Sequence, residues 1–237
     1  MKVDDIRTIF RALNDADVHY LIVGGLAVVA HGYVRFTQDI DLVIQLEREN
    51  VLRAMNALTA IGYRPLIPVD AAQFADETLR QQWRDDKGMI VFQMLNPERE
   101  STRIDIFVTE PFVFEEEFER AKRHNWGDLQ APVIRIEALI AMKQATGRPQ
   151  DLADAALLRD IWSSNVSRVN VNKRAPLNSL SPEERAAWRR HNLQTLAESS
   201  ALPFEKKLAI LEDLEELTVA MGYERDPSTG RLRKSNS

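Results

Sequence analysis

The sequence predicts an α/β (α+β) fold, with a short mixed sheet flanked by helices and a helical hairpin at the C-terminal end. Short apolar β-branched runs alternate with amphipathic helical patterns over the first 164 residues, which favours a sheet covered by helices. One run, Tyr20 to Val23, stops at a glycine pair and precedes small apolar residues typical of a buried helix over Leu26 to His31. A second run, residues 38–44, carries acidic residues at alternate positions.

Composition indicates a globular chain with a substantial core, because 44% of its 237 residues are hydrophobic. The sequence contains no cysteine, which excludes a disulfide framework, thiolate zinc sites and a cysteine nucleophile. The N-terminal residues lack the apolar segment of a secretion signal, and no stretch approaches the roughly 20 apolar residues of a membrane span. We therefore expect a cytoplasmic protein with no membrane partner.

Charge is distributed unevenly along the chain. Residues 1–164 carry 19 Lys and Arg against 26 Asp and Glu, whereas the remaining residues carry 12 against 10. Broad electrostatic capture of nucleic acid needs clustered basic residues, so the acidic body disfavours it. The end of a tRNA reaching a local basic rim remains compatible with this balance.

Apolar spacing predicts an amphipathic helix at residues 4–15 and a second from Glu47 to Ile61. Residues 63–87 are ambiguous: Tyr63 to Val69 has strand character despite two prolines, and Ala71 to Arg84 has helical character. This segment is a candidate wall of a substrate pocket.

The second half of the core contains further apolar runs. Strands are expected at Met89 to Leu95 and Arg103 to Val108, and a short β segment near Val133. Helices are expected from Phe112 to Arg123 and from Ile136 to Ala145.

The chain divides into a core, a linker and a C-terminal appendage. Core residues 1–164 precede a polar linker at 165–180, a helical hairpin at 181–223 and an unstructured tail at 224–237. The second hairpin helix carries an apolar stripe that must pack against the core, its partner helix or another chain: Leu208, Leu211, Leu214, Leu217 and Met221.

Two acids in the second apolar run are the strongest functional signal. On a strand, Asp39 and Asp41 point to one face with Cα atoms roughly 7 Å apart, while Ile40 points into the core. Two carboxylates roughly 5 Å apart repel by roughly 3 kcal/mol at an effective dielectric near 20. Mg²⁺ binds through one or two carboxylates together with substrate phosphate oxygens. A metal site is therefore the functional interpretation, and a solvated strand face is the alternative.

The glycine pair and these acids together resemble the active-site motif of the polymerase-β-type nucleotidyltransferase superfamily. The variant with Arg-x-Thr before Asp-Ile-Asp-Leu looks closest to the AbiEii-like toxin nucleotidyltransferases and to drug-modifying adenylyltransferases. The matching residues are Gly24, Gly25, Arg35, Thr37, Asp39 and Asp41.

A second stretch also resembles the AbiEii-like group. There, a Leu-Ile-Ala-Met-Lys helix precedes a segment with the pattern Lys/Arg-Pro-x-Asp-x-x-Asp, as in Leu139 to Lys143 followed by Arg148 to Asp154. The resemblance implies that Lys143 reaches the nucleotide triphosphate and that Asp151 or Asp154 orients Lys143 or the acceptor. Alternatively, Lys143 is a surface lysine, Asp151 is a helix N-cap and Asp154 is a surface acid.

The resemblance further implies that Asp105 is a third carboxylate that shares a metal ion and accepts a proton. The alternative for Asp105 is an acid facing solvent on a strand. Asp39, Asp41 and Asp105 would hold Mg²⁺, two ions being expected and Mn²⁺ a substitute. Gly24 and Gly25 would cradle the phosphates, and Lys143 with Arg35 would offset their charge. His19 and His31 are interpreted as satisfied polar residues, not as metal ligands.

The implied reaction is transfer of a nucleoside monophosphate from an NTP to an acceptor hydroxyl. One candidate is a toxin that modifies tRNA or a protein, with a cognate antitoxin as partner or self-association through the C-terminal helices. The second is an adenylyltransferase that modifies a small molecule such as an antibiotic. The third is a non-catalytic antitoxin or binding partner with the same fold, which three mutually repelling acids argue against.

Overall fold

The computed structural model describes residues 2–35, 37, 39–99, 102–126, 128–166, 202–210, 213, 223–225 and 232–234. Within these residues the chain forms a seven-stranded mixed sheet flanked by helices, which confirms the predicted fold class. None of the described helices is both long and apolar enough to cross a membrane.

The sheet has the strand order β3-β4-β5-β2-β1-β7-β6. β2 runs parallel to β5 and β1 parallel to β7, whereas the other neighbours are antiparallel. The strands are β1 Tyr20–Ile22, β2 Asp39–Ile44, β3 Arg64–Pro65, β4 Val91–Leu95, β5 Arg103–Phe107, β6 Lys122–Trp126 and β7 Leu129–Val133.

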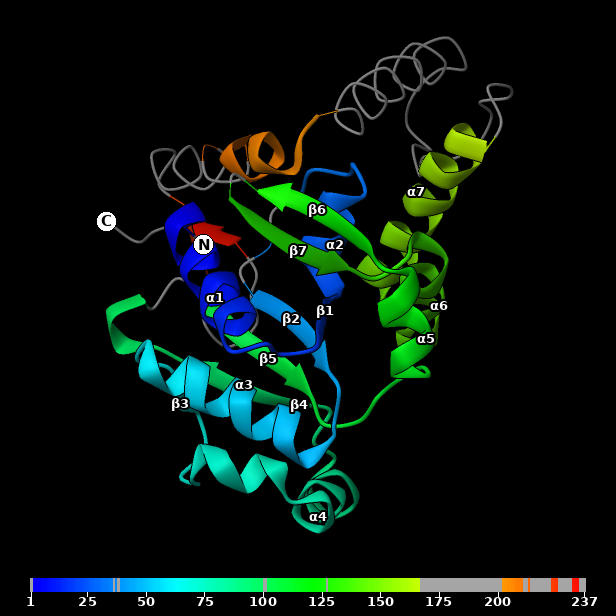
Figure 1. Cartoon of the computed structure of the whole chain (residues 1–237). Helices are drawn as coiled ribbons and strands as arrows, with labels where there is room; N and C mark the ends of the chain where they lie inside the picture. Colours follow the sequence, from blue (N-terminus) through cyan, green and yellow to red (C-terminus); the bar gives the residue numbers. More distant parts are fainter. Residues whose placement is uncertain are drawn as a thin grey trace, which may run out of the picture.

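Helices cover the sheet from several directions. In Figure 1, α1 and α3 lie in front of the strands, and α6 and α7 stand together at the right of the view. The α-helices are α1 Val3–Asp15, α2 Gly24–Ala30, α3 Arg48–Ala60, α4 Glu77–Lys87, α5 Phe114–Arg120, α6 Ile136–Thr146 and α7 Pro149–Val166, with 3₁₀ helices η1 Ala71–Ala75 and η2 Pro97–Arg99.

The central strands present two different faces. On β4, Phe92 and Met94 are fully buried, whereas the residues between and beside them, including Gln93, are half-buried. The Phe92 ring stacks on Phe74, with 4.7 Å between ring centroids, and on Trp83 at 5.7 Å. The main core therefore lies against one face of β4 and β5, and the opposite face carries the polar residues of the sheet.

The prediction of a helix from Phe112 to Arg123 is wrong at its end. Helix α5 stops at Arg120, and Lys122 begins the edge strand β6, which pairs antiparallel with β7. β6 begins Lys-Arg-His-Asn and lacks the alternation of apolar residues that identifies a strand. Its pairing with β7 is visible only in the folded chain.

The ambiguous segment resolves into three short elements. The strand expected over Tyr63 to Val69 shrinks to β3, because the prolines remove backbone donors. The helix expected over Ala71 to Arg84 is interrupted at Asp76, whose carboxylate accepts a hydrogen bond from the backbone N–H of Leu79 and caps α4.

Part of the predicted appendage packs on the core. Residues 204–210 are helical, and Phe204 and Leu208 are 3% and 1% exposed. The linker predicted at 165–180 begins inside α7, which runs to Val166. β8 Tyr223–Arg225, which begins at the last residue of the predicted hairpin, pairs with β9 Leu232–Lys234. The residues of these strands that fall in the predicted tail are therefore not unstructured. Leu211, Leu214, Leu217 and Met221 of the apolar stripe lie outside the described residues.

The two faces of β4 predict opposite responses to truncation at adjacent positions. Phe92→Ala removes a ring stacked between two others, so we expect the free energy of unfolding to fall by about 3 to 5 kcal/mol. Val91→Ala, on the opposite face, should cost less than about 1 kcal/mol. Urea denaturation of both variants measures the difference; equal losses would contradict the assignment of faces.

Candidate functional site

The predicted acids meet on one face of the sheet. β2 and β5 pair in parallel so that Asp41 lies opposite Asp105 and Asp39 lies opposite Arg103. Both Asp39 and Asp41 are half-buried, whereas Ile40 between them is fully buried. The alternation predicted from the sequence is therefore present, and it brings three carboxylates to the face opposite the main core.

Two of these carboxylates have perturbed pKa values. The pKa of Asp41 is raised to about 6, chiefly by burial and also by the charge of Asp39, against the lowering effect of the Gly25 amide. Burial, followed by the charges of Asp41 and Asp39, raises the pKa of Asp105 to about 7. Gln93, directly opposite Asp105 on β4, donates a hydrogen bond to it with 3.1 Å between Nε2 and Oδ1. The acids thus disfavour full ionisation of their own cluster.

The glycine pair forms the first turn of α2 and lies against Asp41. Gly25 donates its backbone N–H to Asp41 Oδ2 at 3.3 Å. Gly24 has φ +59°, and a Cβ added there would lie 1.9 Å from Asp41 Oδ2. A Cβ added at Gly25 would lie 2.3 Å from Thr37 Oγ1. Glycine is therefore required at both positions for this close approach.

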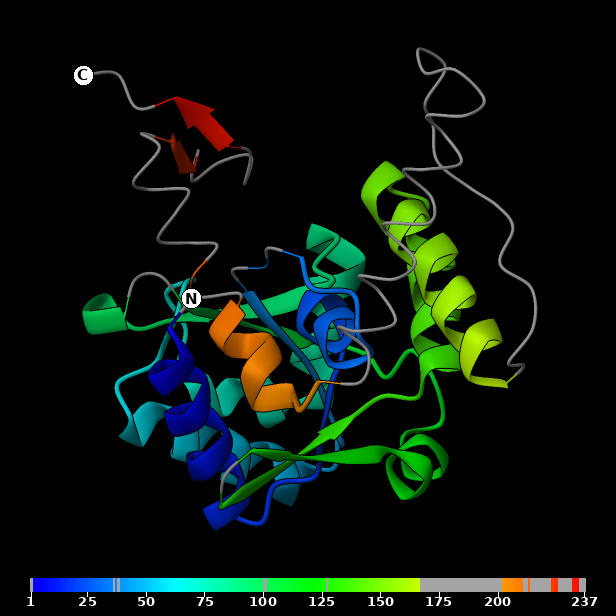
Figure 2. The same cartoon turned by 90° about the horizontal axis from the view of Figure 1, so that it is seen from above.

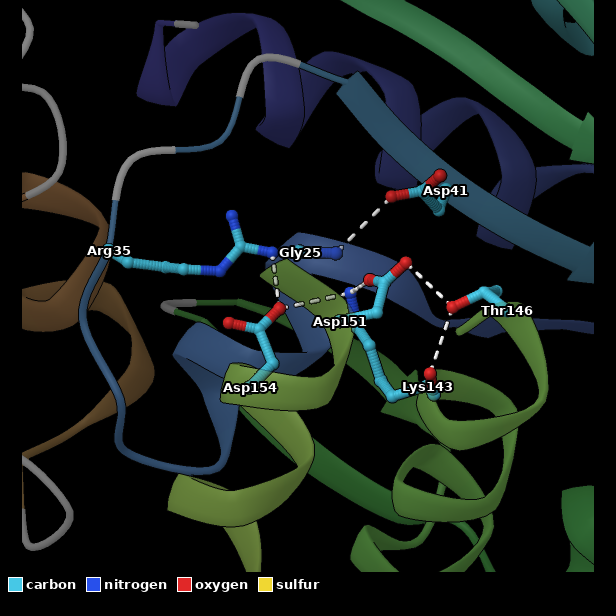
Figure 3. Close-up of polar contacts among 7 residues, drawn as sticks. All are labelled: Gly25, Arg35, Asp41, Lys143, Thr146, Asp151 and Asp154. Atoms are coloured by element: carbon cyan, nitrogen blue, oxygen red, sulfur yellow. Dashed lines mark hydrogen bonds and ion pairs between the residues drawn. The ribbon is translucent and has the colours of Figure 1, made fainter. Parts of the chain in front are cut away.

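Across from the acids lies a network of charged side chains from α6, α7 and the segment before β2 (Figure 3). Lys143 Nζ lies 2.6 Å from Asp151 Oδ1 and 3.1 Å from Asp154 Oδ2. Arg35 Nη2 donates to Asp154 Oδ2 at 2.8 Å. Thr146 Oγ1 donates to Asp151 Oδ2 at 2.7 Å. Asp154, only 2% exposed, therefore binds both cations at once.

The network faces the carboxylates of the sheet. Arg35 Nη2 borders Gly25, where an added Cβ would lie 3.3 Å from it, and the positive charges of Lys143 and Arg35 lower the pKa of Asp41. Seven residues from four elements and a loop thus form one polar site: Gly24, Gly25, Thr37, Asp41, Arg35, Lys143 and Asp154.

Three alternative interpretations of this region are wrong. Lys143 is 8% exposed, so it is not a surface lysine. Asp151 is not the N-cap of α7, because the helix begins at Pro149 and the Asp151 carboxylate binds Lys143 and Thr146. Asp154 is buried and is not a surface acid.

Gln93 and Thr146 contact the site residues but are not among the residues predicted from the sequence. Gln93 is the only polar residue of β4, Val-Phe-Gln-Met-Leu, and that isolation is a usable signal. Thr146 ends α6 and has no comparable signal, since its role depends on the fold of the following helix.

The donor set fits a hard divalent cation. Carboxylate oxygens are the protein ligands that Mg²⁺ prefers. Burial and mutual repulsion raise the pKa values of Asp41 and Asp105, so they disfavour the charged forms that a bound cation would stabilise. Among the described residues, no group of three or more His, Asp or Glu side chains is arranged to hold a metal ion. Asp41 binds the Gly25 amide through one carboxylate oxygen, Oδ2.

No family model matches the chain, and no curated protein matches it. It is similar to a solved structure of the lincosamide antibiotic adenylyltransferase LnuA with lincomycin bound, at 17% identity over 68% of this chain and 98% of that chain, with a TM-score of 0.47. It is also similar to ANT(2")-Ia in complex with adenylyl-2"-tobramycin, at 14% identity over 81% and 97%, with a TM-score of 0.43. The likeness at these values assigns no activity to this chain.

The approach of Gly24 to Asp41 predicts a specific intolerance of alanine. Gly88 has a similar φ of +62° with open space around it, so Gly88→Ala should cost about 1 kcal/mol from backbone strain alone. Gly24→Ala adds a clash that includes the Asp41 Cβ at 2.6 Å and should cost about 2 kcal/mol more. Chemical denaturation compares the two; equal costs would refute the close packing.

The raised pKa of Asp41 predicts how stability changes with pH. Since its folded pKa of about 6 exceeds the ordinary 3.8, the folded state holds the proton more tightly, and stability is lost as pH rises from about 4 to 7. Asp41→Asn removes this loss. In metal-free protein, the free energy of unfolding of the variant relative to wild type should therefore be about 2 kcal/mol higher at pH 8 than at pH 4. Buried His31 and His124, with lowered pKa values, act in the opposite direction in both proteins and cancel.

The check is denaturant unfolding of both proteins in chelator across that pH range. A difference that does not change with pH would contradict the coupled burial of Asp41.

Proposed function

We propose that this chain is a metal-dependent nucleotidyltransferase that moves a nucleoside monophosphate from an NTP to an acceptor hydroxyl. The observation that carries the proposal is the parallel register of Asp41 and Asp105, beside the glycine turn of α2. This register supports a shared cation site next to a place where backbone and phosphate can approach closely.

Asp39, Asp41 and Asp105 would hold Mg²⁺, with two ions expected. When bound, the metal supplies neutralisation of phosphate charge and a lower pKa for the attacking hydroxyl. The residues of the chain keep the site partly dry, since the carboxylates are half-buried on a sheet whose opposite face is core.

Asp105 is proposed as the acceptor of the hydroxyl proton. Without a metal ion, burial and the neighbouring acids raise its pKa to about 7, so it takes a proton more readily than an ordinary carboxylate. Gln93 holds the carboxylate from the neighbouring strand through two contacts, at 3.1 and 3.4 Å. In the reaction, a bond forms between the acceptor oxygen and the α-phosphorus, the bond to pyrophosphate breaks with its electron pair, and the proton passes to Asp105.

Lys143 and Arg35 are proposed to bind the triphosphate. Asp154 holds both cations, and each cation has several N–H donors, so it can also bind phosphate oxygens. The contacts with Asp154 would be kept on nucleotide binding, because a buried carboxylate without a partner is costly. Asp151 and Asp154 therefore act as positioning residues for the cations, while the N–H groups of the Gly24-Gly25 turn approach the phosphates.

The acceptor has two candidates. The Arg35-x-Thr37-x-Asp39 pattern supports an AbiEii-like enzyme that modifies tRNA or a protein. The net charge of −5 supports a small molecule, because an acidic surface repels a nucleic acid. A non-catalytic binding role is disfavoured, since raised pKa values at Asp41 and Asp105 are a cost that binding alone does not require.

The experiment is incubation of the purified protein and Mg²⁺ with each α-labelled NTP in three arms: total tRNA, cell protein and a panel of hydroxylated antibiotics. Label transferred in one arm identifies the acceptor class. Asp105→Asn should abolish transfer, whereas Glu49→Gln, an exposed acid on α3, should leave it intact. Absence of transfer and of pyrophosphate release in every arm would refute the proposal.

Lys143 gives a quantitative prediction for the same assay. If its ammonium meets charge developing on the leaving pyrophosphate, Lys143→Ala should lower turnover at saturating NTP by about a hundredfold, or on the order of 3 kcal/mol. Lys143→Arg should recover part of this, because a planar fork replaces a compact charge. Lys87→Ala, at an exposed lysine of α4, is the matched control. Wild-type turnover in a folded Lys143→Ala protein would remove Lys143 from the site.

A further inference from the structure

The helix formed by residues 204–210 packs against elements that are far from it in sequence, namely α1, α2 and β6. The ring of Phe204 lies 5.5 and 6.1 Å from two aromatic rings of β6, measured between centroids. Glu205 pairs with Arg7 of α1 at 3.5 Å. In Figure 2 this orange helix lies between the dark-blue α1 and the blue α2. It is therefore in position to affect both helices.

Lys207 is the contact between this segment and α2. Its side chain is buried, with the residue 3% exposed, and its Nζ donates to the backbone carbonyl of Ala30 at 2.9 Å. Ala30 is the last residue of α2. The carbonyls at a helix C-terminus lack partners within the helix and carry the negative end of its dipole, which a cation stabilises. A buried ammonium at this point is costly unless it is well bonded, so the contact has a structural effect on α2.

The other end of α2 is the glycine turn of the proposed nucleotide site. Seven residues make a helix of about 10 Å, so displacement at Ala30 is transmitted to Gly24 and Gly25. The Gly25 hydrogen bond to Asp41, at 3.3 Å, is longer than the usual N–H···O distance of about 2.7 to 3.2 Å. A shift of the glycine turn away from Asp41 would therefore break it.

We propose that Lys207 is a positioning residue: by capping the C-terminal end of α2, it fixes the glycine turn against Asp41 and so sets nucleotide affinity. Its effect on affinity rests on the proposed function, whereas its effect on α2 does not. The C-terminal segment thereby contributes to the site without touching the nucleotide.

The test compares Lys207→Met, which keeps the apolar stem and removes the charge, with Lys206→Met at the adjacent exposed lysine. Amide hydrogen exchange reads the position of α2 without any substrate. In Lys207→Met the amides of α2 should exchange about tenfold faster while the central strands are unchanged. The KM for NTP should rise about tenfold with kcat retained. Lys206→Met should match wild type in both measurements.

The outcomes separate this proposal from the proposed function. Uniformly faster exchange with a lower unfolding midpoint and an unchanged KM would mean a purely structural lysine and would overturn the proposal. Faster exchange confined to α2 in a protein that transfers no nucleotide would support the positioning of α2 and sink the nucleotide role. If Lys207→Met does not fold, Lys207→Gln keeps a hydrogen-bond donor without charge; α2 exchange identical to wild type would then overturn the role of the charge.

Discussion

The parallel pairing of β2 with β5 is the constraint on which the candidate site depends. It sets Asp41 directly opposite Asp105 on a face that is not the main core. A register shift of one residue would turn all these acids into the core and the buried isoleucines out of it. Ile40 and Ile104 are fully buried on the opposite face, so the same register that packs the core also positions the carboxylates.

Hydrogen-bond donors and cations around the acids offset the repulsion among them. Asp41 is held by the Gly25 amide, Asp105 by Gln93, and the two cations by Asp154, so each of these charges has a partner. A cation and a triphosphate would add to these partners, because each charged group can form more than one contact. Charge balance would thus be reached without large movements of the helices that carry the charges.

The sequence predicts the parts of this site that depend on local periodicity. Asp39 and Asp41 were identifiable because acids at alternate strand positions stand out against apolar neighbours, whereas the roles of Asp105 and Lys143 were predicted from the resemblance. The contacts of Gln93, Thr146 and Lys207 depend on elements distant in sequence, which no local pattern encodes. The same reason explains the missed strand β6, whose polar sequence becomes a strand only by pairing with β7.

The central claim is that the facing carboxylates hold a cation together with a nucleotide. Calorimetric titration of the protein with a non-hydrolysable NTP analogue, in Mg²⁺ and in chelator, tests it most directly. Wild type should bind the analogue with Mg²⁺ and at least tenfold more weakly in chelator. Asp105→Asn should lose that metal dependence, whereas Glu49→Gln, which removes the same charge from an exposed position, should keep it. Binding that is equally tight with and without Mg²⁺ in wild type, or an unchanged metal dependence in Asp105→Asn, would contradict the account.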